Sequence, residues 1–237
     1  MMLSLLIASG VLIQQNYAEI SSYVNRPLTE ISIENMPQHV SSEALAPLLN
    51  QLRGQGFFDL DVNAAKELLQ SHPWIARVEI QRVWPNTIAI EITEEVAIAR
   101  WGNSSLINQY SELFSPGDIQ QWDTLPILIG PPGTQAQLMS QYHDLNQSLM
   151  ENGLRAGQIS LSARGSWELV LTDNTRVVIG REDIERRVSN FARLYSHMIL
   201  RSPPASGATQ LGPIDTVDLR YNNGFSVKRQ PLEIAAR

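Results

Sequence analysis

The sequence predicts an α+β fold in two units, and two observations carry this prediction. Residues 27–95 read in order as a strand, two amphipathic helices and two strands, whereas residues 96–231 contain short strands with two helices among them. Hydrophobic residues make up 43% of the 237 residues and charged residues only 18%, which excludes an intrinsically disordered chain. We expect the boundary between the two folded units near Glu94-Glu95.

The two helices of the first unit are predicted from caps and from leucine spacing. Ser41 or Ser42 supplies the N-cap of the first helix, and Asp61 supplies that of the second. His72-Pro73 ends the second helix, because proline cannot continue one. The leucines of the first helix recur at intervals of three and four residues and share one face: Leu45, Leu48, Leu49 and Leu52.

Alternating apolar residues predict the three strands of the first unit. The first strand follows Pro27, and Trp84-Pro85-Asn86 has the turn chemistry that joins the other two. With both helices on one face of the sheet, these strands bury one set of apolar side chains. The apolar positions are Leu28, Ile31 and Ile33, then Ile75, Val78 and Ile80, then Ile88, Ile90 and Ile92.

The second unit is predicted as a β-rich domain with one helix near residues 135–152 and another from Glu182 to about Leu200. Asp173-Asn174 suits a tight two-residue hairpin between two of its strands. Its last two strands flank a turn at Asn222-Asn223-Gly224. Strands are expected near residues 96–101, 106–107, 125–129, 158–163, 167–172, 175–180, 216–221 and 225–229.

Residues 1–24 precede both units, and the first 13 are apolar apart from Ser4, Ser9 and Gly10. A helix of that length spans about 20 Å, less than the hydrocarbon core of about 30 Å. No basic residue occurs before Arg26 to form the n-region of a signal peptide. Three interpretations stay open here: the end of a transmembrane helix whose start lies upstream, an atypical signal segment, or a buried helix of a soluble protein.

Composition and motifs disfavour several classes of function. The net charge of -6, without a basic run, argues against a protein that binds the nucleic-acid backbone. The absence of cysteine excludes disulfides and thiolate chemistry. The four histidines lack metal-ligand spacing, and no serine-nucleophile motif occurs. We therefore predict no catalytic residue, cofactor, metal or small-molecule substrate.

Charged residues near the second predicted helix have a structural interpretation. Glu182-Asp183 suits the first turn of that helix electrostatically. The arginines at 181, 186, 187 and 193 accompany Glu182, Asp183 and Glu185, so a salt-bridged outer face is expected.

Arg220 and Tyr221 stand out near the end of the chain. Arginine and tyrosine are enriched at binding hot spots, and a strand near the chain end can form an open sheet edge that docks a partner strand. The competing interpretation is a tyrosine packed into the sheet beside a surface arginine.

Five motifs carry a resemblance to a known family: His72–Val78 (HPWIARV), Arg82–Asn86 (RVWPN), Ile98–Trp101 (IARW), Ala163–Trp167 (ARGSW) and Val217–Tyr221 (VDLRY). In combination they resemble the FtsQ/DivIB family of bacterial cell division proteins over roughly residues 28–229. The strand-helix-helix-strand-strand unit alone resembles a polypeptide-transport-associated (POTRA) domain.

The resemblance implies a non-enzymatic division scaffold in the inner membrane, single-pass type II, with most of the chain in the periplasm and enrichment at the septum. Residues 1–24 would be a partial transmembrane anchor, residues 27–95 the POTRA domain and localisation surface, and residues 96–231 the periplasmic β domain. The implied partners are FtsB and, through it, FtsL, which link early cytoplasmic and late septal components. An alternative is a POTRA-type chaperone module of a secretion or outer-membrane assembly system.

The resemblance also implies a partner-binding site in the second unit. Arg164 and Arg220 would pair with acidic groups of the partner, and Tyr221 would be an aromatic anchor. Asn223 and Gly224 would form the segment beside the docked chain, where the partner adds to the sheet.

Overall fold

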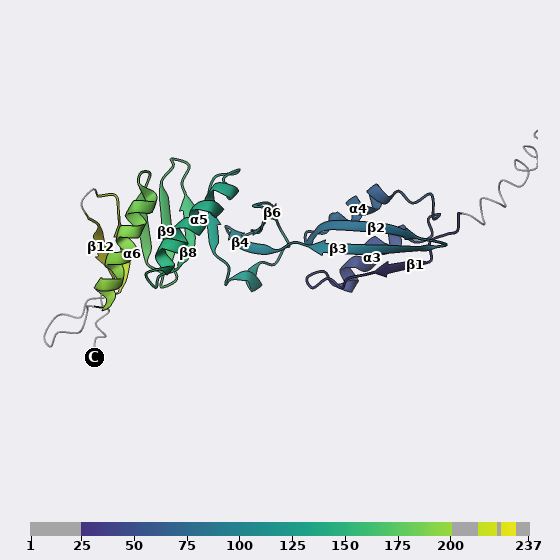
Figure 1. The fold of residues 1–237 in the computed structure, drawn as a ribbon, viewed down its shortest axis with the longest axis horizontal. Helices are drawn as coiled ribbons and strands as arrows, with labels where there is room; N and C mark the ends of the chain where they lie inside the picture. The colour runs from purple at the N-terminus through teal and green to yellow at the C-terminus, as the bar shows by residue number, and fades with distance from the viewer. Residues whose placement is uncertain (1–24, 201–212, 222–223, 231–237) are drawn as a thin grey trace, which may run out of the picture. The chain divides into compact units, whose positions relative to one another are not determined.

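The computed structural model describes residues 25–200, 213–221 and 224–230, and it divides the chain into two compact units, Met1–Glu95 and Val96–Arg237 (Figure 1). The apolar segment of residues 1–24, predicted as an anchor, lies outside the described residues. Within the described ranges, no helix combines the length and apolar character needed to cross a bilayer.

The first unit has the predicted order of strand, two helices and two strands. Its sheet has the order β1-β3-β2, with β1 parallel and β2 antiparallel to β3. Helix α4 packs against β2 and α3, and both helices bury apolar side chains, as β3 does with Ile88, Ile90 and Ile92. The elements are β1 (Glu30–Ile33), α3 (Ser42–Leu52), α4 (Val62–Gln70), β2 (Ile75–Val83) and β3 (Thr87–Glu94).

Both predicted N-caps are confirmed. The hydroxyl of Ser41 accepts a hydrogen bond from the backbone N–H of Ala44 at 3.2 Å, so Ser42 is the first helical residue. One carboxylate oxygen of Asp61 accepts from the backbone N–H groups of Asn63 and Ala64 at 2.9 and 3.1 Å. Each side chain satisfies donors that a helix start otherwise leaves unpaired.

The second unit is a nine-stranded sheet with two long helices. The strand order is β12-β11-β10-β9-β8-β7-β4-β5-β6, so β12 and β6 are its edges among the described strands. The elements are β4 (Ala97–Trp101), β5 (Ser105–Asn108), β6 (Leu113–Phe114), η1 (Gln120–Trp122), β7 (Ile127–Ile129), α5 (Gln135–Met150), β8 (Ala156–Leu161), β9 (Trp167–Leu171), β10 (Arg176–Gly180), α6 (Ile184–Leu200), β11 (Ile214–Asp218) and β12 (Ser226–Arg229).

Two parallel crossovers place α5 and α6 on the same face of this sheet. Helix α5 connects the parallel strands β7 and β8, and α6 connects the parallel strands β10 and β11. Both crossovers move toward the β12 edge, and right-handed crossovers of one direction cover one face. Leu145 of α5 and Phe191 of α6 accordingly lie in one core with Ile159, Leu169 and Val177 of the strands.

The predicted two-residue hairpin between β9 and β10 is wrong. The N–H of Leu171 donates to the carbonyl of Thr175, so three residues, Thr172, Asp173 and Asn174, form the loop. Asn174 has a φ of 67°, which asparagine tolerates, and the Asp173 carboxylate accepts from the Thr175 N–H at 2.9 Å. A left-handed residue after a turn gives this longer loop.

Other element boundaries of the second unit also differ from the predictions. Helix α6 begins at Ile184 instead of Glu182, because Asp183 has a φ of 53°, outside the helical region. Strand β11 ends at Asp218, so Arg220 and Tyr221 follow the strand instead of lying on it. The two-residue strand β6 was not predicted, and β8 begins two residues before its expected position.

Candidate partner-binding site

One end of the second unit gathers arginines from four separate segments. Arg164 lies in the turn between β8 and β9, Arg181 follows β10, Arg187 is in the first turns of α6, and Arg220 follows β11. These four side chains line a cavity of about 400 Å³ together with Ser162, Ser166, Gly180 and Glu182. We call these eight residues the arginine pocket. With four guanidinium groups and one carboxylate, it suits an acidic ligand.

Gly180 allows the arginines to approach one another. Its φ is 95°, a backbone conformation that residues with a Cβ rarely adopt. A Cβ at this position would lie 3.0 Å from Nη1 of Arg187 and 3.2 Å from Cγ of Arg220. Arg187 also donates from Nη1 to the carbonyl of Ile179 at 2.8 Å, which fixes its guanidinium at the end of β10.

Asp218 orients Arg220. Its Oδ1 accepts from the Arg220 backbone N–H at 3.0 Å and from Nε at 2.9 Å, while Oδ2 accepts from Nη2 at 2.6 Å. The hydrogen bond from the Arg220 side chain is the main reason why the pKa of Asp218 is lowered. The Arg220 side chain is still 63% exposed, and in the described part of the chain its Nη1 donors have no acceptor.

An apolar groove adjoins the arginine pocket and shares Arg187 with it. The groove has a volume of about 460 Å³ and lies between α6 and the segment that joins β11 to β12. We call it the aromatic groove. Its lining residues are Arg186, Arg187, Asn190, Phe191, Arg193, Leu194, Leu219, Tyr221, Gly224 and Phe225.

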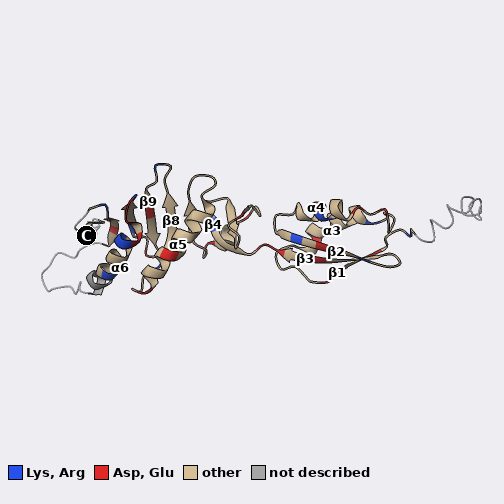
Figure 2. Cartoon of the chain, turned by 45° about the horizontal axis from the view of Figure 1, so that its top comes forward, with Lys and Arg blue, Asp and Glu red and all other residues tan. Residues whose placement is uncertain are grey.

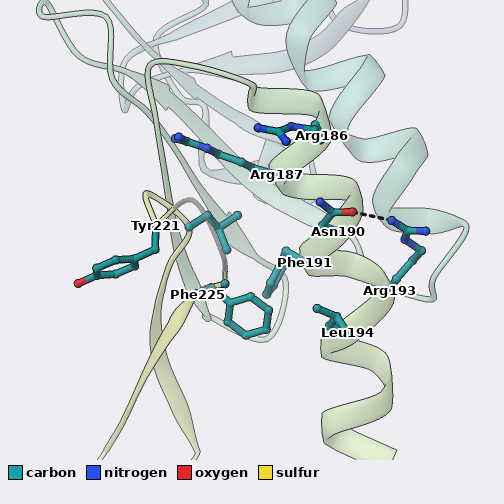
Figure 3. Close-up of a pocket in the computed structure, with 10 residues that line it drawn as sticks. Arg186, Arg187, Asn190, Phe191, Arg193, Leu194, Tyr221 and Phe225 are labelled. Atoms are coloured by element: carbon teal, nitrogen blue, oxygen red, sulfur yellow. Dashed lines mark hydrogen bonds between the residues drawn. The ribbon is translucent and has the colours of Figure 1, made fainter.

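The aromatic groove exposes part of its apolar lining. Phe225 meets Phe191 edge to face, with ring centroids 6.1 Å apart. In Figure 3 the ring of Phe225 lies on the side of Phe191 and Leu194, whereas the ring of Tyr221 points away from the helix. Tyr221 and Leu194 are 60% and 53% exposed. An exposed tyrosine beside a groove is the kind of side chain that anchors a partner.

The expected salt-bridged face of α6 forms only in part. Among the arginines at 181, 186, 187 and 193, and within the described residues, only Arg186 pairs with a carboxylate, that of Asp183. Arg193 instead donates a hydrogen bond from its Nη2 to the Oδ1 of Asn190 at 2.5 Å. Arg187 and Arg193 of this helix can therefore pair with acidic groups of a partner; basic positions on α6 are blue in Figure 2.

The structure brings four of the five predicted site residues onto this surface. Arg164 and Arg220 line the arginine pocket, and Tyr221 and Gly224 line the aromatic groove. Asn223 lies outside the described residues. Sequence reasoning missed Phe191, Leu194 and Phe225 as groove residues, because their helical or alternating spacing marks them equally well as core.

The described residues show no arrangement typical of a metal centre. Within residues 25–200, 213–221 and 224–230, no three metal-ligating side chains of His, Asp or Glu gather at one point. The tyrosines with a raised pKa, Tyr142 and Tyr195, owe the shift first to burial. Both hydroxyls have structural partners, since Tyr142 donates to the carbonyl of Ala156 and Tyr195 bonds Thr175 at 2.9 Å.

Comparison with known proteins matches both units of the chain. The family model "POTRA domain, FtsQ-type" matches residues 26–95, and "Cell division protein FtsQ/DivIB, C-terminal" matches residues 99–220. These two matches meet near the boundary between the units.

Three similar curated proteins share the name "Cell division protein FtsQ". That of Thioalkalivibrio sp. (strain K90mix) is 34% identical over 203 residues, which covers 85% of this chain and 80% of the relative. That of Coxiella burnetii is 30% identical over 202 residues with the same coverage. That of Neisseria gonorrhoeae is 28% identical over 236 residues, 98% of this chain and 89% of the relative. The chain therefore belongs to the FtsQ/DivIB family of bacterial cell division proteins.

Proposed function

We propose that this chain is a non-enzymatic scaffold of the division machinery that binds FtsB, and through it FtsL, with its second unit. Membership of a family of cell division proteins supports the role in division. The observation that carries the site is the junction of the arginine pocket and the aromatic groove, which share Arg187. The arginines of this surface can pair with acidic side chains of the partner, and the exposed Tyr221 can pack against an apolar side chain.

The edge strand β12 supplies the third part of the proposed site. Gln230 donates its N–H to Pro213 on the β11 side, and N–H groups alternate in direction along a strand. The N–H group of Val227 therefore faces away from β11, toward the side of β12 that no other described strand covers. An extended partner segment can pair with this edge while its side chains reach the groove.

We place the chain in the inner membrane as a single-pass type II protein, with both units in the periplasm at the septum. The apolar run within residues 1–24 supports this placement, as does membership of the family. In this arrangement the first unit is a second interaction surface for other division proteins.

Titration of the purified chain with the periplasmic part of FtsB tests the binding site. We expect Tyr221→Ala and Arg220→Glu each to weaken binding by on the order of 2 kcal/mol or more, about 30-fold in Kd. Arg164→Glu provides a second charge reversal in an exposed turn, where it does not disturb Asp218.

Two exposed residues outside the site are matched controls. Tyr110 is 71% exposed between β5 and β6, and Arg77 is exposed on β2. Tyr110→Ala and Arg77→Glu should leave the affinity unchanged. Unchanged affinity in Tyr221→Ala, Arg220→Glu and Arg164→Glu alike contradicts the proposed site.

A further inference from the structure

We propose that the end of the first unit at which residue 25 enters rests on the lipid bilayer through Trp84 and Phe58. We call this end the N-proximal end and define it by Asn25-Arg26, the loop of residues 53–60 and the turn of residues 83–86. The proposed contact rests on the membrane placement proposed above, but it is independent of FtsB binding.

Hydrogen bonds hold the three parts of the N-proximal end together. The N–H of Phe57 donates to the carbonyl of Arg26 at 2.8 Å, and that of Phe58 donates to Oδ1 of Asn25 at 2.8 Å. Arg82 joins the β2–β3 hairpin to the same loop, because its Nε donates to the Phe57 carbonyl at 3.0 Å. The loop that carries Phe58 is therefore tied to the incoming chain and to the strand that leads to Trp84.

The strand register places the Trp84 turn at this same end. Strand β1 starts at Glu30, which lies opposite Thr87 at the start of β3. The backbone N–H of Thr29 donates to the carbonyl of Asn86 at 3.2 Å. The turn therefore lies beside the first residues of β1, while Glu94 marks the opposite end of the sheet, where the chain leaves the unit.

Large apolar side chains are exposed at the N-proximal end. Trp84 is 68% exposed, Phe58 55% and Val83 47%. The other four tryptophans are buried or partly buried, so Trp84 stands apart from them. Single exposed apolar residues are ordinary, but a tryptophan and a phenylalanine at the point where an apolar segment joins a domain match the residue types of membrane interfaces.

The sequence keeps this end near the apolar run. Residues 14–24, eleven in number, separate residues 1–13 from Asn25. They reach at most about 40 Å when fully extended, so the N-proximal end cannot move farther than that from the run.

We expect the N-proximal end to contact lipid by insertion of Trp84 and Phe58 into the bilayer interface, and less by attraction between its charges and the lipid head groups. Arg26, Arg53 and Arg82 are basic, but Asp59 and Asp61 lie in the same loop region and offset part of this charge. We therefore expect contact with zwitterionic and anionic lipids alike, with little dependence on salt.

The lack of cysteine in the chain permits single-site labelling. We would place an environment-sensitive fluorophore at Val83→Cys, which leaves Trp84 intact, and at Met36→Cys as the control. Met36 is 80% exposed and follows Asn35, which hydrogen bonds Ile92 near the opposite end of the sheet. The full chain is reconstituted into phosphatidylcholine vesicles with and without nitroxide-labelled lipid, and flotation verifies that it is bound.

We expect nitroxide lipid to quench the label at position 83 more strongly than the label at position 36. Trp84→Ser with Phe58→Ser should abolish this excess, because both side chains are exposed and their replacement leaves the fold intact. Equal quenching at the two positions in floated protein overturns the lipid contact and leaves the anchor and FtsB binding standing. If quenching is equal at the two positions and an added division protein blocks labelling of Val83→Cys, the N-proximal end binds a protein instead of lipid. Failure of the chain to float overturns the anchor and the lipid contact together.

Discussion

Glu94 fastens the end of β3 to the segment that precedes α3. Its carboxylate accepts hydrogen bonds from the backbone N–H groups of Gln38, His39 and Val40 at 2.8, 2.7 and 3.1 Å. The ring of His39 also stacks on Trp74, with centroids 4.4 Å apart. Burial raises the pKa of Glu94, but the hydrogen bonds from Gln38 and His39 outweigh it, so the pKa is lowered overall.

The lowered pKa predicts how Glu94→Gln changes stability with pH. A carboxyl with a lowered pKa in the folded state stabilises the fold above its unfolded pKa, and it loses this effect as the pH falls through the folded pKa. We expect Glu94→Gln to lower the free energy of unfolding by about 1–2 kcal/mol at pH 7, with a smaller loss near pH 4. Urea titrations at both pH values measure this, with the exposed Glu91→Gln as control. A loss that grows toward acid pH contradicts the assignment.

Gly180 is the residue whose small size the arginine pocket requires. In Gly180→Ala, backbone strain at a φ of 95° adds to crowding against Arg187 and Arg220. We expect a loss of stability of about 1–3 kcal/mol together with weaker FtsB binding. Thermal unfolding and calorimetric titration measure the two effects.

Gly133→Ala separates strain from crowding. Gly133 has a φ of 85°, but nothing lies within 4 Å of the position that its Cβ would occupy. This variant should lose stability without losing affinity for the partner. Loss of affinity in both variants, or in neither, would show that crowding of the arginines does not control binding.

Among the elements, β12 is the one whose backbone is proposed to bind a partner. Val227→Pro removes an N–H that faces away from β11, while Lys228→Pro removes one that faces β11. We expect Val227→Pro to weaken FtsB binding by about 1 kcal/mol or more, the net value of one hydrogen bond, with the sheet retained.

Lys228→Pro should instead lower the stability of the second unit, because it breaks the pairing with β11. Calorimetric titration and thermal unfolding of both variants distinguish the two outcomes. Full affinity in a folded Val227→Pro variant would show that the partner does not pair with β12.

The elements also show what local sequence signals can predict. The caps at Ser41 and Asp61 and the alternating strands of the first unit were predictable, because each depends on residues close together in the sequence. The start of α6 was misplaced, since Asp183 adopts a left-handed conformation that its residue type permits but does not require. A two-residue strand such as β6 is too short to show alternation.

The arginine pocket depends on long-range topology, which sequence patterns do not specify. The family resemblance points to Arg164 and Arg220, whereas the local charge pattern assigns Arg181 and Arg187 to a salt-bridged helix face. Their convergence follows from the β10–α6–β11 crossover and from the turn before β9, which bring four distant segments to one end of the sheet.

The two units of the chain have different proposed tasks. The second unit has its own core, which runs from Ala99 to Leu219, and it holds all described residues of the proposed FtsB site. The first unit carries the N-proximal end and the surface proposed for other division proteins. Binding of FtsB should therefore change the second unit locally and leave the first unchanged.

Hydrogen exchange of the full chain with and without the periplasmic part of FtsB measures whether FtsB binding is confined to the second unit. We predict slower amide exchange in β12 (Ser226–Arg229), around Arg220-Tyr221 and in the first turns of α6, with no change in α3 or α4. Protection confined to residues 27–95, or no protection at saturating FtsB, would contradict the account.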